Sequence, residues 1–554
     1  MPKPRPGDVG MLHNWAAALL ANGDAAKALE IARRAFGLSE TAELKSLLAR
    51  ALKDVRDGSH DPALRPLVAR ALAEGWGRPQ DLAGVAIRLL REGNPALLQI
   101  DPLMVALLEN VIVADRSLET LLTAARADLL SSSFPRKRES IEPPLDSRFR
   151  GNDGMGFACA LARQCFINEY VWACDTAEWA DAQQLRDELI AALDAGSPTE
   201  PLSLISVAAY FPLHTLPNVE RLLTRDWPAP VRSILVQQVR EPAEERLLQD
   251  SLPALTAIAD PTSRAVQQQY EENPYPRWVK TLPAGGGMSF DSFITKQLPL
   301  APYRPNGKGG AIDMLIAGCG TGQHAIETAR LFPEAKMLAV DLSRASLAYA
   351  KRQGDALGLK TIEYVQADIL EMGSLDRRFD VIESSGVLHH LADPMAGWQV
   401  LLSILRPGGV MWVGLYSELA RQDVVAARDF IAQNGFGDGA DDIRHARQAM
   451  IAAGDDVPFA PITKVGDFFS TSACRDLLFH VQEHRLTVPR IADFLAANDL
   501  TFLGFDLDPR AARLYQERFP SDAAMTDLAD WHQFETENPL TFRNMYQFWV
   551  QKAG

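Results

Sequence analysis

Short apolar runs alternate with segments of helix length from residue 311 onward, and this alternation restricts the fold more than any other feature of the sequence. Five runs read as buried strands, at 312–317, 336–340, 362–366, 379–383 and 410–416. Strands that alternate with helices pair in parallel, and helices then cover both faces of the sheet. The sequence therefore predicts an α/β domain, in which Ser343 caps the helix after the second strand.

Candidate ligand-binding residues directly follow the first three strands. In parallel sheets of this kind, ligands bind beyond the carboxyl ends of the strands. The first strand ends in Gly318-Cys319-Gly320-Thr321-Gly322, where glycines allow close approach and the next helix begins with free N–H groups. Asp341 follows about 20 residues later, the spacing of a carboxylate that accepts hydrogen bonds from a ribose. Asp368 ends the third strand, where a carboxylate can bind an adenine amino group.

The glycine spacing distinguishes two nucleotide cofactors. A dinucleotide-binding loop reads GxGxxG, whereas this loop reads GxGxG and continues with Gln323. With Asp341, Asp368 and Arg406-Pro407-Gly408-Gly409, it resembles the class I S-adenosylmethionine-dependent methyltransferases over about residues 310–554. The resemblance implies a seven-stranded Rossmann-like sheet with an antiparallel edge from strands at 501–506 and 545–551, and S-adenosylmethionine as cofactor. The cofactor-binding residues that it implies are Gly318, Cys319, Gly320, Gly322, Asp341, Leu342, Asp368, Ile369 and Ser384.

One position departs from the family's pattern. Members often carry an acidic residue two positions before the first glycine, where it helps to hold the methionine ammonium group. This chain has Ile316 there, and Asp313 lies too far back in the strand to replace it. We expect backbone carbonyls of the loop, or a residue of an aromatic arm at 270–278, to hold the ammonium group instead.

The loop after the fourth strand is expected to face the transferred methyl group, as it does in the family. His389 and His390 resemble histidines found there in small-molecule C- and O-methyltransferases, and both are candidate catalytic bases because histidine titrates near neutral pH. The alternative is that one of them only packs or forms hydrogen bonds that hold the loop. The loop lacks an Asn/Asp-Pro-Pro-Tyr/Phe motif, which argues against methylation of adenine or glutamine amide nitrogens.

Two further segments are expected to enclose the acceptor. Residues 419–484 read as inserted helices, a place where the family often carries a substrate lid. His480 and His484 would share a helix face there, but no third ligand is apparent, so we predict a lid role and no metal. The arm at 270–278 either covers the cofactor or is an ordered linker packed on the sheet. The candidate substrate and lid residues are Tyr270, Tyr275, Trp278, Tyr416 and His480.

The first half of the chain reads as helices over 1–130 and 157–260. A Trp15-bearing helix, a turn at Gly23 and a second helix lined by small alanines resemble a tetratricopeptide repeat, although one unit is a weak match and a generic helical bundle is the alternative. Such repeats bind peptides, so a protein partner is expected here. Residues 131–156, rich in Pro and Gly, read as a disordered insertion that resembles a translated repetitive DNA element, with a basic nucleic-acid arm as the alternative. Residues 261–309 read as a linker that contains the arm.

Composition narrows the function. The 71 acidic and 56 basic side chains give a net charge of -15, which weighs against nucleic acid as a partner. The five cysteines form no CxxC pair, which is typical of a reducing compartment and argues against structural zinc. No signal peptide or membrane-length apolar run is recognisable, so a cytoplasmic protein with no membrane contact is expected.

The layout as a whole resembles bacterial tetratricopeptide-repeat methyltransferases. The sequence thus predicts a bacterial, cytoplasmic enzyme that transfers a methyl group from S-adenosylmethionine to a protein or a small molecule. The helical repeats favour a protein acceptor and the histidine loop a small molecule. The alternatives are a non-catalytic interaction scaffold with a degenerate methyltransferase domain and an RNA methyltransferase, the latter opposed by the acidic charge balance.

Overall fold

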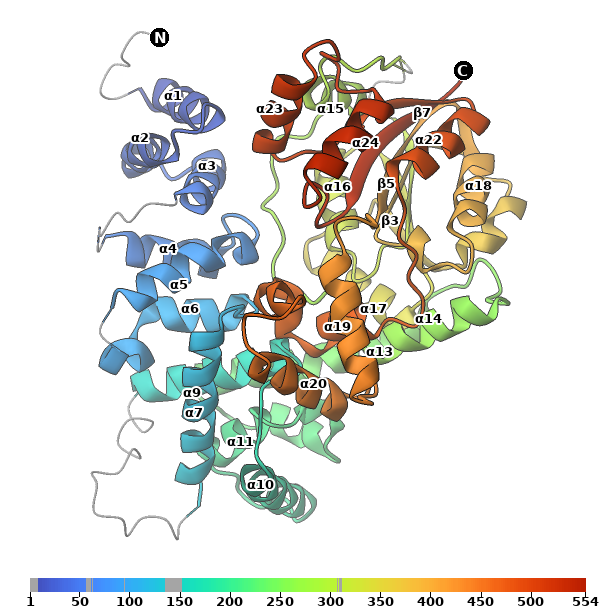
Figure 1. The fold of residues 1–554 in the computed structure, drawn as a ribbon. Helices are drawn as coiled ribbons and strands as arrows, with labels where there is room; N and C mark the ends of the chain where they lie inside the picture. The colour runs from blue at the N-terminus through green and yellow to red at the C-terminus, as the bar shows by residue number, and fades with distance from the viewer. Residues whose placement is uncertain are drawn as a thin grey trace.

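The computed structural model describes residues 8–55, 61, 63–93, 95–134, 152–305, 307 and 311–554. It consists of a helical region followed by a sheet domain, with the first helices standing in a column beside that domain (Figure 1). The main helices of the helical region are α1 (Val9–Ala21), α2 (Ala25–Leu38), α3 (Ala42–Asp54), α4 (Leu64–Glu74), α5 (Ala83–Arg91), α6 (Pro102–Asn110), α7 (Arg116–Ser132), α9 (Asn152–Ile167), α10 (Thr176–Asp194), α11 (Pro201–Ala208), α12 (Ala229–Leu235) and α13 (Glu241–Ser251).

Local sequence explains where the first helices begin and how they pack. The side chains of Asp8, Asp24 and Thr41 accept hydrogen bonds from the first-turn amides of α1, α2 and α3, as N-cap residues do. The small residues Ala28 and Ala32 of α2 are fully buried, and one continuous apolar core extends from Leu12 to Val239. The helical character of this region agrees with the sequence, whereas its assignment to tetratricopeptide repeats stays a prediction.

The segment predicted as an insertion lies mostly outside the described residues. Residues 131–132 form the end of α7, and residues 152–156 belong to the start of α9. Residues 135–151 are not described.

The sheet domain has the predicted fold class. Its seven strands run in the order β3-β2-β1-β4-β5-β7-β6, with the first five parallel and β7 antiparallel to both of its neighbours. Arg406 to Gly409 belong to the fifth strand instead of preceding it, because that strand begins at Leu405 and pairs there with Phe379. The strands are β1 (Asp313–Ala317), β2 (Lys336–Asp341), β3 (Ile362–Gln366), β4 (Phe379–Ser385), β5 (Leu405–Leu415), β6 (Leu500–Phe505) and β7 (Tyr546–Lys552).

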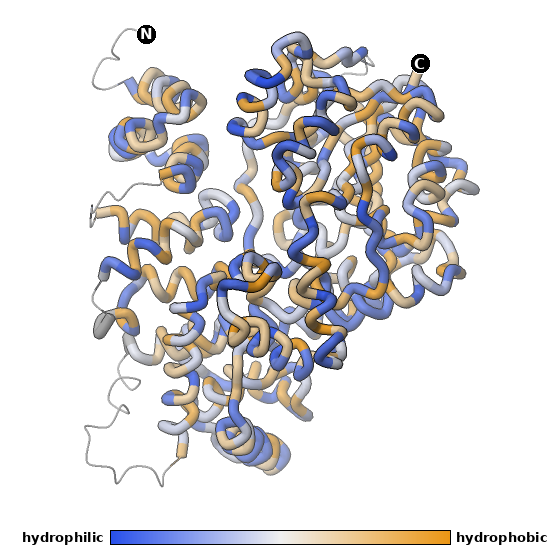
Figure 2. Tube along the Cα trace, viewed as in Figure 1, coloured by the Kyte–Doolittle hydropathy of each residue, from blue (hydrophilic) through white to orange (hydrophobic). Residues whose placement is uncertain are grey.

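Helices cover both faces of this sheet, as alternating strand residues require. Leu315 and Ala317 belong to one buried cluster and Met314 and Ile316 to the other. Hydrophobic and hydrophilic residues alternate along the chain of this domain in Figure 2, as elements with one buried face require. The cluster that contains Leu315 also includes residues of α18 (Pro394–Ile404), α22 (Val488–Ala497), α23 (Pro509–Arg518) and α24 (Leu528–Glu537). The cluster that contains Met314 includes residues of α15 (Phe290–Gln297), α16 (Gln323–Leu331) and α17 (Arg344–Ala356). Helices α23 and α24 were not predicted from the sequence.

The inserted segment after β5 forms α19 (Gln422–Gln433), α20 (Ala440–Ala452) and α21 (Thr471–Phe479), which share a small core of their own. The expectation that His480 and His484 share a helix face was wrong. The last helical residue of α21 is Phe479, so His480 only caps the helix and His484 lies beyond it.

The segment before the sheet is more helical than predicted. Helix α14 (Pro261–Glu272) includes Tyr270, where an extended arm was expected to begin. The prolines at 274 and 276 end this helix without disturbing its body, because proline restricts the residue before it and removes a backbone donor only at its own position. The extended arm is therefore residues 273–281, hereafter the arm.

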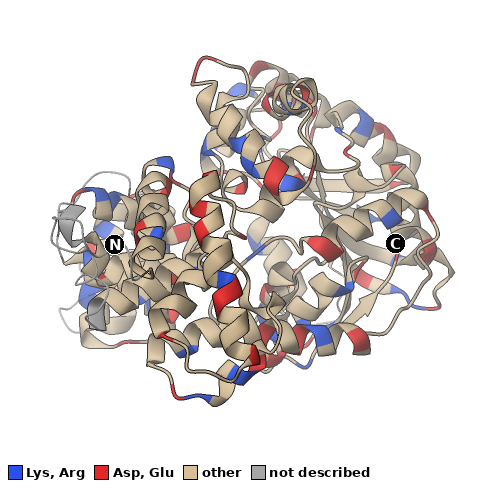
Figure 3. Cartoon of the chain, turned by 90° about the horizontal axis from the view of Figure 1, so that it is seen from below, with Lys and Arg blue, Asp and Glu red and all other residues tan. Residues whose placement is uncertain are grey.

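The surface gives two further observations. Acidic and basic residues are interspersed along the chain in the view of Figure 3. Across the described part of the chain, no helix combines the length and the apolar character that crossing a membrane would take.

Candidate cofactor and acceptor site

A cavity of about 400 Å³ lies at the carboxyl ends of the parallel strands, where the sequence places the site. Most predicted site residues line it: Gly318, Cys319, Gly320, Asp341, Leu342, Asp368, Ile369, Tyr270, Tyr275, His390 and Tyr416. Gly322, Ser384, Trp278, His389 and His480 do not belong to its lining.

The glycine loop is shaped by what packs against it. Gly318 has φ +79, and a Cβ there would lie 2.3 Å from Val387 of the histidine loop. Gly320 has φ +52, and a Cβ there would lie 2.7 Å from the carbonyl oxygen of Tyr275 in the arm. Both positions therefore need glycine, for conformation and for space.

Asp341 holds the glycine loop from the end of β2. Its carboxylate accepts hydrogen bonds from the backbone N–H of Gly320 at 2.8 Å and of Ser343 at 2.9 Å. Burial raises the pKa of Asp341 to about 6, and the two backbone hydrogen bonds oppose this shift. The carboxylate thus fixes the loop and also faces the cavity.

Asp368 brings a buried carboxylate with one unpaired oxygen to the cavity. The residue is 1% exposed, and its Oδ1 accepts a hydrogen bond from the N–H of Leu370 at 3.0 Å. Its Oδ2 is buried and has no hydrogen-bond partner. Buried polar atoms are almost always hydrogen-bonded, so this oxygen is positioned to accept from a ligand.

A carboxylate stands next to the position where the family's acidic residue is absent. Ile316 of β1 is paired with Glu383 of β4, and paired residues of parallel strands project from the same face. Glu383 lines the cavity, is 4% exposed and lies 2.6 Å from Nε2 of His324. Burial lowers the pKa of His324, but the Glu383 carboxylate outweighs burial and raises it overall. Asp313, by contrast, pairs with Arg406 at 2.8 Å, which agrees with its exclusion as a substitute.

The arm fastens onto the outside of the glycine loop. Trp278 does not wall the cavity; its Nε1–H points at the carbonyl and hydroxyl oxygens of Thr321, both at 3.2 Å. The Thr321 hydroxyl in turn donates to the carbonyl of Pro276. Tyr270 and Tyr275 do line the cavity, so the arm and the end of α14 both support the loop and cover the site.

His390 presents a defined face to the cavity. Its Nδ1 lies 2.8 Å from the carbonyl oxygen of Gln482, so Nδ1 carries the proton and donates. Burial lowers the pKa of His390 to about 4, so the ring is neutral at physiological pH. The lone pair of a neutral ring with this tautomer is on Nε2, which makes this atom a candidate proton acceptor.

His389 has a different setting. It is fully buried outside the cavity lining and stacks on Tyr416, with ring centroids 3.8 Å apart. Neither ring nitrogen has a hydrogen-bond partner, and burial lowers the pKa of His389 below its usual value. Only the second histidine of the predicted pair is thus exposed to the cavity.

A buried hydrogen-bonded chain borders the histidine. The N–H of Gln482 donates to Nδ1 of His480, so the proton of the neutral ring is on Nε2, 3.2 Å from the Tyr270 hydroxyl. Tyr270 donates to Asp476 at 2.6 Å, and burial raises the pKa of Asp476 to about 7.

His390, Asp476 and His480 bring ligand atoms within 4.8 Å of one another, a metal-like grouping that the sequence reading did not find. The hydrogen bonds, however, place a proton on Nε2 of His480 and commit its Nδ1 to a backbone donor. Because a histidine binds metal through a lone pair, this arrangement suits a proton network better than a metal centre.

Several residues of the cavity were not singled out from the sequence, and they come from four separate segments: His324, Glu383, Asp476, Met545 and Gln547. Glu383 had a usable signal, because it directly follows the apolar residues Val381 and Ile382 of a buried strand, and a carboxylate is rarely buried without a partner. The others have no local signal, because only the tertiary fold brings them to β4.

Strand order, glycine loop and the two strand-end carboxylates together define a class I methyltransferase fold. Residues 314–409 match a family model described as a methyltransferase domain. The remaining parts of the chain lie outside this match.

Three curated relatives cover parts of the chain. An uncharacterized protein of Synechococcus sp. is 27% identical over 45% of this chain, and a trans-aconitate 2-methyltransferase of Deinococcus radiodurans is 36% identical over 21%. A ubiquinone biosynthesis O-methyltransferase of Cereibacter sphaeroides is 30% identical over 22%. The chain spans 61%, 40% and 44% of the lengths of these relatives, respectively.

Proposed function

We propose that the protein is an S-adenosylmethionine-dependent methyltransferase that acts on a protein or small-molecule acceptor, and we favour a small molecule. The observation that carries the cofactor assignment is the buried, unpartnered Oδ2 of Asp368, which can accept a hydrogen bond from the adenine amino group. Asp341 can accept hydrogen bonds from the ribose hydroxyls, since its carboxylate lines the same cavity. S-adenosylmethionine, when bound, supplies an electrophilic methyl group on a sulfonium.

The methionine part of the cofactor needs an anion for its ammonium group. We assign this role to Glu383, which replaces from β4 the acid that is missing at Ile316 of β1. His324 holds the carboxylate at 2.6 Å and so fixes its orientation. The sequence had suggested that loop carbonyls or a residue of the arm hold the ammonium group. We prefer Glu383, because a charged acceptor forms a stronger hydrogen bond with an ammonium group than a neutral one does.

The acceptor side supports a base-assisted transfer. Nε2 of His390 would take the proton of an acceptor hydroxyl or carbon acid, while the backbone carbonyl of Gln482 holds the ring in the required tautomer. Tyr270, Tyr275 and Tyr416 wall the cavity and exclude water, which favours direct transfer between aligned groups. The names of two relatives, for trans-aconitate and for an O-methylation, support a small acceptor. The retained carboxylates disfavour a non-catalytic scaffold.

The test is direct. Calorimetry should show one site for S-adenosylmethionine, and no heat at millimolar cofactor would contradict the proposal. Incubation with methyl-labelled cofactor and cell extract should then place label in the small-molecule fraction. Label found only in protein would assign a protein acceptor, and the helical region would become the place to look for its binding surface.

Glu383→Gln is expected to weaken S-adenosylmethionine binding about 10- to 100-fold, because a charge-assisted hydrogen bond is worth about 1.5–3 kcal/mol. Binding of 5′-methylthioadenosine, which lacks the amino-acid part, should not change. Calorimetry with both ligands measures the difference, and Glu371→Gln, which changes an exposed carboxylate of the same domain, is the control. An equal loss for both ligands would show that Glu383 does not act on the ammonium group.

A further inference from the structure

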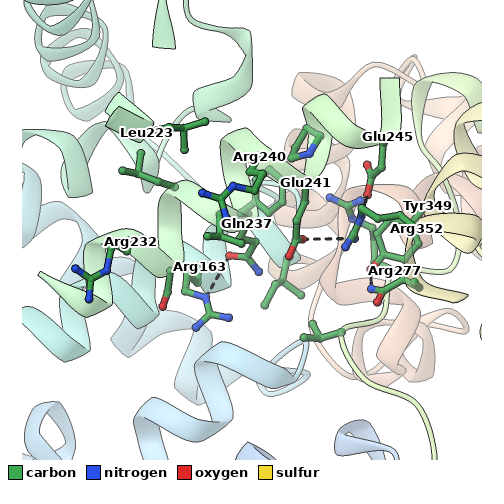
Figure 4. Close-up of a pocket in the computed structure, with 18 of the residues that line it drawn as sticks. Arg163, Leu223, Arg232, Gln237, Arg240, Glu241, Glu245, Arg277, Tyr349 and Arg352 are labelled. Atoms are coloured by element: carbon green, nitrogen blue, oxygen red, sulfur yellow. Dashed lines mark hydrogen bonds and ion pairs between the residues drawn. The ribbon is translucent and has the colours of Figure 1, made fainter. Parts of the chain in front are cut away.

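A second cavity, of about 610 Å³, lies between the helical region and the sheet domain (Figure 4). Helices α9, α12, α13 and α17 contribute to its walls, together with residues 223–227 and the arm residues 277–279. None of its lining residues lines the cofactor cavity. Its volume is within the usual range of small-molecule sites.

The lining is strongly cationic in a chain of net charge -15. Its only carboxylates are those of Glu241 and Glu245, as far as the described residues go. Its arginines are Arg163, Arg225, Arg232, Arg240, Arg277 and Arg352.

One side of the cavity is neutralised by its own ion pairs. Arg352 lies 2.8 Å from Glu245 and 3.4 Å from Glu241, and Arg277 lies 3.6 Å from Glu169. Figure 4 shows Glu245, Arg352 and Arg277 gathered on this side, with Tyr349 among them. These pairs join α13 to α17 and the arm to the helical region, so a structural role accounts for them.

The other side has arginines that no carboxylate of the cavity neutralises. Arg225 donates to the carbonyl of Ser197 at 2.9 Å and lies 3.2 Å from the hydroxyl of Thr199, both uncharged. Arg232 donates to the carbonyl of Trp227 at 2.8 Å, and its nearest carboxylate, 3.6 Å away, is on Asp226, which points fully into solvent. Within the described part of the chain, the side chain of Arg240 forms no hydrogen bond or ion pair.

We propose that this cavity binds a small polyanion whose phosphate or carboxylate groups contact Arg225, Arg232 and Arg240. Guanidinium groups form two parallel hydrogen bonds with such oxyanions, and they are the side chains best suited to planar, bidentate recognition. Ion pairs with Glu245, Glu169 and Glu109 account for Arg352, Arg277 and Arg163, respectively. Among the described residues, Arg225 and Arg240 have no carboxylate partner, and Arg232 has only the solvent-exposed Asp226. The lining also offers Leu223 and Trp227 as apolar surface for the body of a ligand.

Calorimetry and thermal unfolding with inorganic pyrophosphate and with citrate test the proposal without any cofactor, so the result is independent of the proposed methyltransferase function. Ionic strength is held constant with sodium chloride, because screening alone changes exposed charge interactions. We expect one site, and a higher melting temperature with pyrophosphate, citrate or both. Tighter binding of one anion identifies phosphate or carboxylate as the preferred group.

The double variant Arg232→Gln/Arg240→Gln should bind the preferred anion at least about 10-fold more weakly, since it removes charge-assisted hydrogen bonds from two arginines. Both side chains are exposed, so the fold should be retained. Arg513→Gln, an exposed arginine on the distant helix α23, is the matched control. Ser233→Asp, which adds a negative charge to the lining, should weaken binding without removing any arginine. The proposal would be overturned if neither anion binds, or if the affinity for the preferred anion is unchanged in both the double arginine variant and Ser233→Asp.

Discussion

Asp341→Asn is expected to weaken S-adenosylmethionine binding by at least about 100-fold, or about 3 kcal/mol, measured by calorimetry. The carboxylate accepts from the N–H of Gly320 and of Ser343, and the proposed ribose contacts use the same oxygens. An amide cannot replace it, because its NH₂ group would meet a backbone donor. Each lost charge-assisted hydrogen bond is worth about 1.5–3 kcal/mol, and at least one contact to the loop and one to the ligand are removed.

The Asp341 carboxylate should also determine how S-adenosylmethionine binding depends on pH. Burial raises the pKa of Asp341 to about 6 in the free protein. Ribose hydroxyls would donate to the ionised form, so binding lowers this pKa and is linked to proton release. Affinity should therefore be constant above about pH 7 and fall as the pH drops through 6. Asp341→Asn should abolish this dependence.

Two controls distinguish the loss of ligand contacts in Asp341→Asn from a general destabilisation of the domain. Asp355→Asn changes an exposed carboxylate on the same helix that Ser343 caps, and it should leave the dissociation constant unchanged. 5′-Methylthioadenosine retains the ribose, so Asp341→Asn should weaken its binding as much as the binding of S-adenosylmethionine. Glu383→Gln, by contrast, should weaken only the binding of S-adenosylmethionine. A dissociation constant within threefold of the parent value would contradict the assignment.

The part of the cavity proposed to hold the cofactor was predictable, because its residues follow local rules. Each residue proposed to bind the cofactor lies at or directly after the end of a buried strand, and parallel pairing brings strand ends to one edge whatever the rest of the chain does. Asp341 and Asp368 could thus be placed from strand positions alone. The one local departure, Ile316, suggested that loop carbonyls or an arm residue hold the ammonium group, and it gave no indication of the role proposed for Glu383 on the neighbouring strand.

The part of the cavity proposed to hold the acceptor was less predictable, because it is assembled from distant segments. Asp476 of α21, Tyr270 of α14 and Met545 next to β7 meet only after the insertion folds back over the sheet. The i, i+4 spacing of His480 and His484 suggested a shared helix face, but the helix ends before either residue. His480 instead meets His390, with ring centroids 3.6 Å apart, a contact that no spacing rule reveals.

Arg447→Met is expected to lower the free energy of unfolding by about 3–5 kcal/mol, the usual cost of leaving one member of a buried ion pair alone. Arg447 of α20 is 1% exposed and forms a two-pronged contact with Glu119 of α7, at 2.9 and 3.2 Å. It also donates to the carbonyls of Val171 at 3.0 Å and Phe468 at 2.6 Å. Urea unfolding, followed by fluorescence, measures the loss.

The double variant Arg447→Met/Glu119→Gln tests whether the uncompensated charge is the cause. Removing both charges should recover part of the lost stability, because the remaining amide is cheaper to bury than a carboxylate. If the double variant is no more stable than the single one, the two carbonyl contacts, and not Glu119, carry the effect.

The Arg447–Glu119 ion pair also links the helical region to the side of the cavity proposed for the acceptor. Helix α20 packs with α21, which carries Asp476, so Arg447 fixes the insertion against α7 while leaving the ends of β1 to β3 untouched. Arg447→Met should therefore increase proteolytic cleavage within 419–484 but change cofactor affinity less than about threefold, well below the effects expected for direct ligand contacts. A parallel loss of cofactor affinity would mean that the insertion and the cofactor loops fold as one cooperative unit.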